Sequence, residues 1–181
     1  LLLLGTEGIA VGMSTKILPH NIQEVIDAVI AILEEKSVTL YPDFPTGGYI
    51  DVSEYDDGTG KILVRATLDT RDPKRIVIRD LPYGSTTETL IASIESAARK
   101  NKVKIAGIND YTTEKVEIEL KLPRGVYSEE VLDSLYAFTD CETAISVNPL
   151  VIVDGKPVVI PISRIISYHS QKLIEILKAE L

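Results

Sequence analysis

The sequence contains 181 residues, of which 45% are hydrophobic and 25% charged. This composition suits one domain or a compact pair of subdomains and excludes a disordered chain. The formal net charge of −8 argues against generic binding of nucleic acids, so any contact with DNA has to use a local surface.

A single cysteine, Cys141, excludes an internal disulfide and fits a reducing compartment. The four leucines at the start are too few for a membrane span or for the core of a signal peptide. We therefore predict a cytoplasmic protein without membrane contacts. Because position 1 is Leu rather than Met, and because the last residues continue a helical pattern, we expect the sequence to be a piece of a longer protein.

Three glycines, Gly5, Gly8 and Gly12, fall within eight residues near the start. Glycine lets the backbone turn tightly and lets another surface approach closely. Between the last two glycines lies the short apolar run Ile9-Ala10-Val11, which favours a β-strand. One interpretation is a buried strand with glycines at its ends, because isoleucine side chains are normally buried. The other is an exposed loop that presents the isoleucine to a partner.

The next element is predicted to be a helix over residues 21–35. Asn21 and Glu24 have the spacing of a capping box, and Pro19 punctuates the chain just before them. Apolar residues then recur at helical spacing on one face, namely Ile22, Val25, Ile26, Val29, Ile30 and Leu33. We interpret His20 as a loop or cap residue rather than a metal ligand, since no partner lies at ligand spacing.

Residues 41–60 are rich in proline and glycine, which predicts turns. Beyond them, residues 61–69 alternate between apolar and polar side chains, as expected of a strand that is buried on one face. A second strand is predicted over 75–81, after a turn. A third is predicted over 115–122, with residues 103–108 pairing with it.

Two more helices belong to this central part of the chain. Ser85 and Glu88 form a second potential capping box, which predicts a helix through about Lys100. Ser128 is expected to cap a short helix with apolar residues Val131, Leu132, Leu135 and Phe138. The order strand-strand-helix-strand-strand-helix predicts an α+β fold, in which helices cover one face of mixed sheet layers.

The last part of the chain begins with a predicted hairpin. Residues 150–153 and 158–160 flank Asp154-Gly155, a strong signal for a two-residue turn. Ser163 is then expected to cap a helix that continues to the end, with Ile166, Leu173, Leu177 and Leu181 roughly in register.

Charge is distributed unevenly along the chain. Residues 21–60 carry nine acids and one lysine, and residues 111–148 carry eight acids and three bases. Residues 61–80, by contrast, carry six bases and three acids. Each of these bases either contacts phosphate or merely solvates a sheet edge, and the sequence leaves both interpretations open.

Two long motifs resemble a known family. The stretch GTEGIAVGMSTKILPHN (residues 5–21) resembles the pattern S-x-G-I-A-V-G-M-[AS]-T-x-I-P-P-H-N of the A subunit of bacterial type IIA topoisomerases, and PDFPT follows at 42–46. Asp80-Leu81-Pro82-Tyr83 resembles the family's E-I-P-Y, and residues 135–139 resemble its L-Y-x-x-T. The resemblance covers essentially the whole chain and is closer to the topoisomerase IV type than to the gyrase type. Leu18 departs from the pattern by replacing the first proline of P-P-H-N.

The resemblance implies that the chemistry lies outside this sequence. The family cleaves DNA with a tyrosine that directly follows an arginine, and none of the eight tyrosines here follows an arginine. His20, Cys141 and His169 share no recognisable catalytic spacing. We therefore predict no catalytic residue and no metal site, and we expect the segment alone to be inactive.

The resemblance further implies the DNA-binding and DNA-bending tower (shoulder) region. In the family the isoleucine of G-I-A-V-G is a wedge between base steps, and this position is Ile9. Gly8 would let the segment approach the minor groove, and Lys16 is the nearest candidate for a phosphate contact.

The same resemblance implies three segments: a DNA-facing part with the first helix (1–60), an α+β core (61–148), and a hairpin that leads into a coiled-coil arm (149–181). The implied partners are double-stranded DNA, an ATPase B subunit that uses ATP and holds most of the Mg²⁺, and a second copy of the A subunit. The alternative is a non-enzymatic α+β module that binds proteins rather than DNA.

Overall fold

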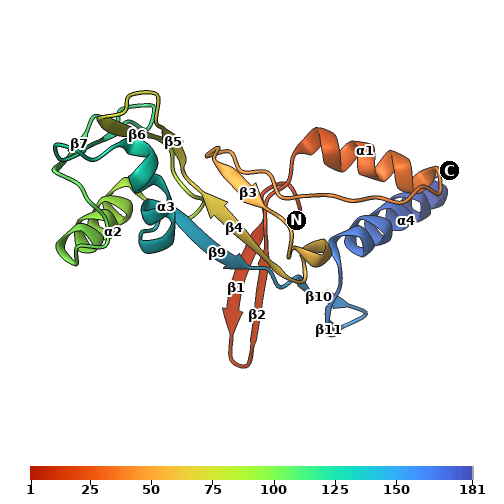
Figure 1. Ribbon diagram of the computed structural model, residues 1–181. Coiled ribbons are helices and arrows are strands. Elements are labelled where there is room, and N and C mark those ends of the chain that lie inside the picture. Colours follow the sequence, from red (N-terminus) through yellow and green to blue (C-terminus); the bar gives the residue numbers. More distant parts are fainter. Residues whose placement is uncertain (181) are drawn as a thin grey trace. The chain divides into compact units, whose positions relative to one another are not determined.

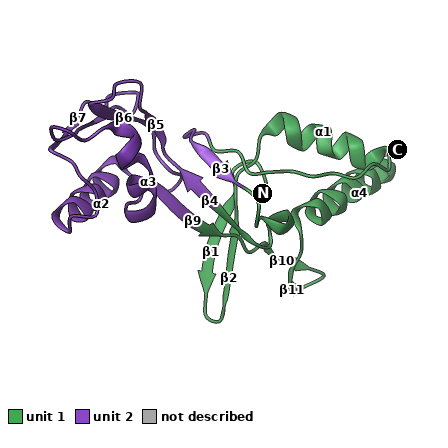
Figure 2. Ribbon diagram, viewed as in Figure 1, with its two compact units in different colours: residues 1–44, 52–62, 145–181 green, residues 45–51, 63–144 purple. Residues whose placement is uncertain are grey.

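The computed structural model describes residues 1–180, which form two compact units (Figure 2). Unit 1 comprises residues 1–44, 52–62 and those from 145 onward, and unit 2 comprises residues 45–51 and 63–144. Both units combine helices with antiparallel strands, which confirms the predicted α+β class. The division into three segments made from the sequence stays a prediction.

Unit 1 is built from two hairpins and two α-helices (Figure 1). Its elements are β1 (Thr6–Ala10), β2 (Met13–Ile17), α1 (Ile22–Leu33), the short 3-10 helix η1 (Asp56–Gly58), β10 (Leu150–Val153), β11 (Lys156–Val159) and α4 (Ile162–Glu180). The β10–β11 hairpin turns at Asp154 and Gly155, which both have positive φ, as the sequence predicted for this pair.

Unit 2 is built around a four-stranded antiparallel sheet in the order β5-β6-β8-β7. Its elements are β3 (Tyr49–Asp51), β5 (Thr67–Asp69), β6 (Arg75–Asp80), α2 (Thr87–Arg99), β7 (Gly107–Asp110), β8 (Ile118–Lys121) and α3 (Ser128–Phe138). Strands β4 (Lys61–Arg65) and β9 (Glu142–Ser146) each have residues in both units, and they form a second sheet in the order β3-β4-β9.

The core of unit 2 lies between this four-stranded sheet and helices α2 and α3. Its fully buried apolar side chains are Ala66, Ile76, Ile78, Leu90, Ile94, Ile118, Leu120 and Leu135. They come from positions at which the sequence alternates in strands or repeats at helical spacing, so these predictions are confirmed. Phe138, which was predicted to belong to the apolar face of α3, is instead half exposed. Cys141 is buried beside them.

One predicted strand is divided in the structure. Residues 61–69 form β4 and β5, which belong to different sheets and are separated at Ala66. The amide of Ala66 donates to the carbonyl of Cys141, 2.8 Å away, whereas β5 pairs with β6. The alternation of side chains continues through the break, because Ile62, Val64 and Ala66 are all buried.

Three helix caps differ from their predictions. Asn21 caps α1 through the Gln23 amide, without the reciprocal bond expected from Glu24. The capping box of α2 lies one residue later than predicted and uses Thr86 with Thr89. The hydroxyl of Ser128 donates to the Thr70 carbonyl instead of capping α3. The exact cap thus depends on which neighbouring polar group each side chain can reach.

The start of α4 is held by a distant carboxylate. Asp57 accepts hydrogen bonds from both the amide and the hydroxyl of Ser163. A negative charge at this place also favours the positive end of the helix dipole. Ser163 thus marks the start of the helix, as predicted, but as a donor to Asp57 rather than as the cap. The predicted position Leu181 lies outside the described residues.

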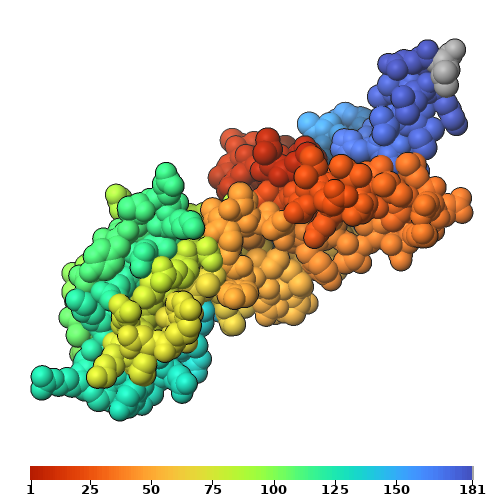
Figure 3. All heavy atoms as spheres, turned by 90° about the horizontal axis from the view of Figure 1, so that it is seen from above, coloured from red at the N-terminus to blue at the C-terminus, as the bar shows by residue number. Residues whose placement is uncertain are grey.

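The apolar faces of α1 and α4 are only partly covered. The two helices lie side by side in unit 1 (Figures 1 and 3), yet Ala28 is the only residue of α1 that is buried. About half of the side-chain surface stays exposed at Ile22, Ile26, Ile30 and Leu33 of α1, and at Leu173, Ile176 and Leu177 of α4. The apolar stripe predicted for α1 exists, but within residues 1–180 it is not buried. No helix in this range is long and apolar enough to cross a membrane.

The buried side chain of His20 contacts two distant parts of unit 1, at Leu2 and at Tyr55. Its Nδ1 lies 3.2 Å from the Leu2 carbonyl oxygen, and its Nε2 lies 3.2 Å from the Tyr55 hydroxyl. Burial lowers the pKa of the imidazole below its ordinary value, although hydrogen bonds to backbone groups partly oppose this shift. His20 is therefore a buried structural residue between the β1–β2 hairpin and α1.

This burial predicts a pH-dependent stability. Because the native pKa of His20 is lowered, the unfolded chain binds more protons below the ordinary histidine pKa of about 6.5. The stabilisation is therefore present above that pH and is lost as the pH falls. We expect the free energy of unfolding, measured in urea, to fall between about pH 7.5 and 5.5 by less in His20→Gln than in the wild type. His169→Gln, which removes an exposed histidine of α4, is the control, and equal falls in wild type and His20→Gln would contradict the prediction.

Candidate nucleic-acid interface

The stretch with three glycines forms an exposed hairpin. Strands β1 and β2 pair antiparallel from Thr6↔Ile17 to Ala10↔Met13, and the chain turns at Val11 and Gly12. Its tip extends away from the rest of unit 1 (Figure 1). Ile9 retains 86% of its exposure, and Val11 is fully exposed. Of the two interpretations made from the sequence, the exposure of Ile9 is confirmed, but the expected loop is wrong, because the exposed element is a strand.

The register places two of the predicted site residues on one face of this hairpin. Lys16 lies opposite Glu7, and Ile9 lies two residues farther along the same strand as Glu7. Since side chains alternate between the faces of a strand, Ile9 and Lys16 share a face, while Gly8 belongs to the other. The Lys16 ammonium is 3.3 Å from the Glu7 carboxylate. An ion pair as exposed as this contributes at most about 1 kcal/mol, so Lys16 can exchange its partner for a phosphate.

Gly8 has no conformational reason to be glycine in the free protein. A Cβ atom placed there would meet only the Thr15 methyl group at 3.6 Å, which is an ordinary contact. Gly5, at the base of the hairpin, is different. Its φ is +69°, and a Cβ atom would lie 2.6 Å from the Ile17 carbonyl oxygen. Gly5 is thus required by the fold, whereas a requirement for Gly8 has to come from a bound partner.

Asn148 fixes the base of the hairpin from a distant part of the sequence. Its backbone exchanges two hydrogen bonds with Lys16, at 2.9 and 3.0 Å. The side-chain amide of Asn148 donates to the Ser14 carbonyl at 2.7 Å, and its backbone carbonyl oxygen accepts from the Thr15 hydroxyl at 3.3 Å. These four bonds hold β2 from Ser14 to Lys16 and leave the tip of the hairpin free. The sequence did not single out Asn148, because nothing local indicates a contact with so distant a strand.

The basic run at 61–80 does not form an open cationic surface. Its four arginines all pair with acids: Arg65 with Glu142, Arg71 with Asp69, Arg75 with Asp72 and Glu119, and Arg79 with Glu117 and Asp69. Hydrogen bonds from Arg75 and then from Asn109 lower the pKa of the Glu119 carboxyl, as expected when the charged form is stabilised. These arginines are therefore occupied by acids of the same chain.

The described residues offer little for catalysis. Among residues 1–180 no three histidine, cysteine, aspartate or glutamate side chains are grouped so that they could hold a metal ion. Burial raises the pKa of the Cys141 thiol to about 11, which leaves it a poor nucleophile. The arrangement of the hairpin is suited to binding rather than to covalent chemistry.

Comparisons with known proteins support the resemblance seen in the sequence. The family model for the A subunit of DNA gyrase/topoisomerase IV matches residues 1–181. The chain is 56% identical to the A subunit of DNA topoisomerase 4 from Borreliella burgdorferi over 181 residues, which is 100% of this chain and 29% of that protein. It is 34% identical to the DNA gyrase A subunit of Lawsonia intracellularis and 33% identical to that of Brachyspira hyodysenteriae, over 93% and 98% of this chain. These alignments cover 23% and 24% of the two gyrase proteins. The chain thus spans less than a third of the length of these relatives.

The two glycines of the hairpin give a paired prediction. Gly5→Ala should lower the free energy of unfolding by about 2 kcal/mol or more, since a left-handed backbone costs an alanine about 1–2 kcal/mol and the methyl group would overlap the Ile17 carbonyl. Gly8→Ala should change it by less than about 0.5 kcal/mol, because the added methyl group would meet only the Thr15 methyl group, at an ordinary contact distance of 3.6 Å. Urea unfolding of the two variants measures both values. Similar losses in both would show that Gly8 is also required by the fold.

Proposed function

The chain belongs to the A-subunit family of DNA gyrase and topoisomerase IV, and from this premise we propose that it is the DNA-binding and DNA-bending tower region of a type II topoisomerase. In this proposal the complete enzyme breaks a duplex, passes another through it and rejoins the ends. This region grips and bends the DNA for that reaction. The observation that carries the proposal is the exposed Ile9 on an anchored hairpin.

The exposure of Ile9 is difficult to explain by the needs of the fold. Ile9, Val11 and Met13 are all exposed near the tip of one hairpin, and apolar groups gathered on a protruding element usually mark an interaction site. In proteins that bind the minor groove, apolar side chains are inserted between base steps and kink the duplex, at an unstacking cost of about a few kcal/mol. A two-stranded hairpin supplies the stiffness that such insertion needs.

The remaining predicted site residues have complementary roles in this proposal. Gly8, on the opposite face from Ile9, lets the backbone come close to the sugar edges of the groove, because it has no side chain to keep them apart. Lys16 releases Glu7 and neutralises a phosphate. The contact therefore combines an apolar wedge, a close backbone approach and one charge, and none of these reads the base sequence directly.

The rest of the reaction is assigned to other parts of the enzyme. None of the tyrosines here follows an arginine, so we place the nucleophilic tyrosine elsewhere in the complete A subunit. We propose a heterotetramer of two A subunits and two ATPase B subunits, working in the cytoplasm, in which the B subunit uses ATP and holds most of the Mg²⁺. The described residues contain no acid cluster that would compete for that metal.

Ile9→Ala separates a wedge from a core residue. Truncating a buried isoleucine destabilises a protein by about 2–5 kcal/mol, whereas we expect a change within about 0.5 kcal/mol at this exposed position. In the reconstituted enzyme, the ratio of bent to unbent DNA should fall at least about tenfold, because about three carbon groups worth about 0.8 kcal/mol each would no longer be buried between bases. Fluorescence energy transfer between the ends of a bound duplex measures this ratio.

The control is Ile152→Ala. Ile152 lies in β10, on the other hairpin of unit 1, and is 79% exposed. Its truncation should leave both stability and bending unchanged. If Ile9→Ala lost much of its stability and still bent DNA normally, Ile9 would be a structural residue and not a wedge. That result would favour the alternative, an interaction module that does not bind DNA.

A further inference from the structure

Free cations gather at one end of the four-stranded sheet of unit 2. Between residues 96 and 108 the chain carries Arg99, Lys100, Lys102 and Lys104 and no acid, although it is acidic as a whole. All four residues are exposed. None of them forms an ion pair within residues 1–180, in contrast to the arginines of 61–80.

The backbone that carries these cations is well fixed. Helix α2 ends in a Schellman motif, in which the Asn101 amide donates to Ala98 and the Lys102 amide donates to Ala97, both at 2.9 Å. Asn101 takes the left-handed conformation, with a φ of 53°, that this motif requires. Val103 is buried in the core directly after it. Lys100 and Lys102 therefore lie in the motif that ends the helix, and Lys104 directly follows the buried Val103.

The sheet register adds more cations to the same end. Lys121, the last residue of β8, lies opposite both Arg75, the first residue of β6, and Gly107, the first residue of β7. Lys74 precedes Arg75, and its carbonyl accepts from the Leu122 amide at 3.2 Å. Neither Lys74 nor Lys121 forms an ion pair within the described part of the chain.

The opposite end of the sheet is mainly acidic. It carries Asp80 at the end of β6, Asp110 at the end of β7 and Glu114 in the turn before β8, with Lys115 as a cation without an ion pair in the described chain. The cationic end is not free of acids either, because Asp69 and Asp72 lie beside Arg71 and Arg75, and Glu129 and Glu130 lie in the first turn of α3. The two ends nonetheless differ strongly in charge, so a polyanion is attracted to the basic end of this sheet and repelled by the acidic end.

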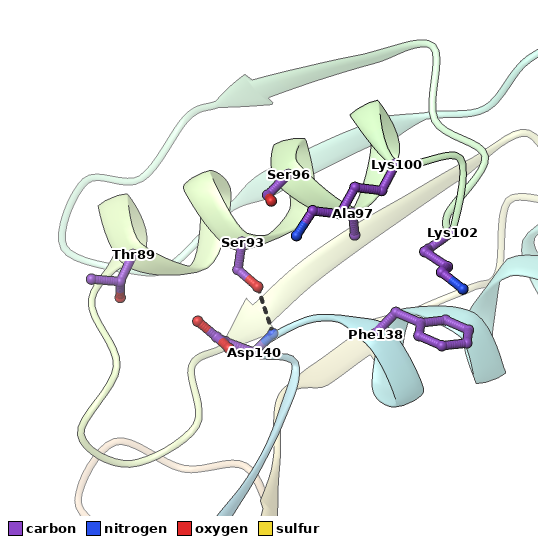
Figure 4. Close-up of a pocket in the computed structure, with 8 residues that line it drawn as sticks. All are labelled: Thr89, Ser93, Ser96, Ala97, Lys100, Lys102, Phe138 and Asp140. Carbon is purple, nitrogen blue, oxygen red and sulfur yellow. Dashed lines mark hydrogen bonds between the residues drawn. The ribbon is translucent and has the colours of Figure 1, made fainter.

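Part of the cationic end borders a hollow of about 500 Å³ between α2 and the segment after α3 (Figure 4). Lys100 and Ser93 lie along one side, and Lys102 lies over the ring of Phe138, 5.2 Å from its centre. Asp140 contributes one carboxylate, but no ion pair joins it to either lysine in residues 1–180. The cations are thus spread along an open surface and do not converge on a buried point.

We propose that this cationic end, defined as Lys74, Arg99, Lys100, Lys102, Lys104 and Lys121, binds the phosphate backbone of duplex DNA as a contact separate from the hairpin. The inference rests on the proposed function. Exposed cations that form no ion pair within the described residues and are spread along an open surface fit a linear polyanion, which carries one charge per about 1.7 Å, better than they fit a small anion. Among the described residues that line the hollow, Phe138 is the one aromatic side chain, and Lys102 lies over its ring, so we expect the contact to be independent of base sequence.

The salt dependence of DNA binding tests this proposal. The variant is Lys100→Gln/Lys102→Gln/Lys104→Gln in the complete enzyme, and the probe is a duplex of about 40 base pairs followed by fluorescence anisotropy at about 50–200 mM KCl. Each lost phosphate contact lowers the slope of log K against log salt by about 0.9. We expect the slope to fall by about 2–3 and the affinity at about 100 mM KCl to fall at least about tenfold.

Two control variants separate local from general charge effects. Lys36→Gln/Lys61→Gln/Lys172→Gln makes the same change in net charge at exposed lysines of unit 1 that already pair with Glu34, Glu54 and Glu175. It should lower the slope by less than about 1. Lys100→Arg/Lys102→Arg/Lys104→Arg keeps the charge and should keep the wild-type slope.

The outcomes also separate this proposal from the proposed function. An unchanged slope in the glutamine variant, or an equal fall in the unit 1 control, would overturn the second contact, while reduced bending by Ile9→Ala would still support the hairpin. Normal bending by Ile9→Ala with a reduced slope in the glutamine variant would overturn the wedge and leave the phosphate contact standing. A wild-type melting temperature in the glutamine variant shows that the lost affinity is not caused by unfolding.

Discussion

The structure of the candidate interface depends on how the base of the β1–β2 hairpin is held. An isolated two-stranded hairpin is marginally stable at best in water, and this one has no apolar core of its own, since Ile9, Val11 and Met13 are exposed. Its rigidity comes from the four hydrogen bonds of Asn148 and from the tight backbone approach at Gly5. A stiff base with a free apolar tip is what a side chain needs if it is to be inserted between stacked bases.

The basic side chains fall into two groups: those that pair with acids of the same chain and those that remain available to a partner. An acidic chain would repel DNA if its cations were all neutralised, and the arginines of β4 to β6 are indeed paired with acids. The lysines at and after the end of α2 form no ion pair within the described residues, and they are exposed on a segment that the Schellman motif and the buried Val103 hold in place. Attraction to phosphate is therefore confined to a few positions and leaves the overall charge of −8 in place.

Local patterns predicted much of the fold. The apolar spacing placed α1 and α2 to within two residues at either end, and Asp154-Gly155 identified the β10–β11 turn. Strands β3 and β9 were missed, because β3 has only three residues and both strands exist through pairing with the distant β4. The caps of α1, α2 and α3 differed in detail, and the start of α4 depends on Asp57, which is far away in the sequence. Long-range contacts of this kind leave no local signal.

The site was predictable only in part, and for the same reason. The motif suggested Ile9, Gly8 and Lys16, and the structure places Ile9 and Lys16 on one face of an exposed hairpin. The apolar run alone favoured burial of Ile9, since isoleucine is usually inside. Its exposure results from contacts made by Asn148 and Gly5, neither of which stood out as a site residue.

The central claim is that Ile9 opens a base step, and local unstacking tests it most directly. The measurement uses the reconstituted enzyme and a set of duplexes in which 2-aminopurine, whose fluorescence rises when it is unstacked, occupies successive positions across the bound site. We expect a strong rise at one step, or at a pair of steps related by symmetry, with the wild-type enzyme, and the loss of that rise with Ile9→Ala. Quenched fluorescence at every position with the wild-type enzyme, or a rise that survives Ile9→Ala, would contradict the claim.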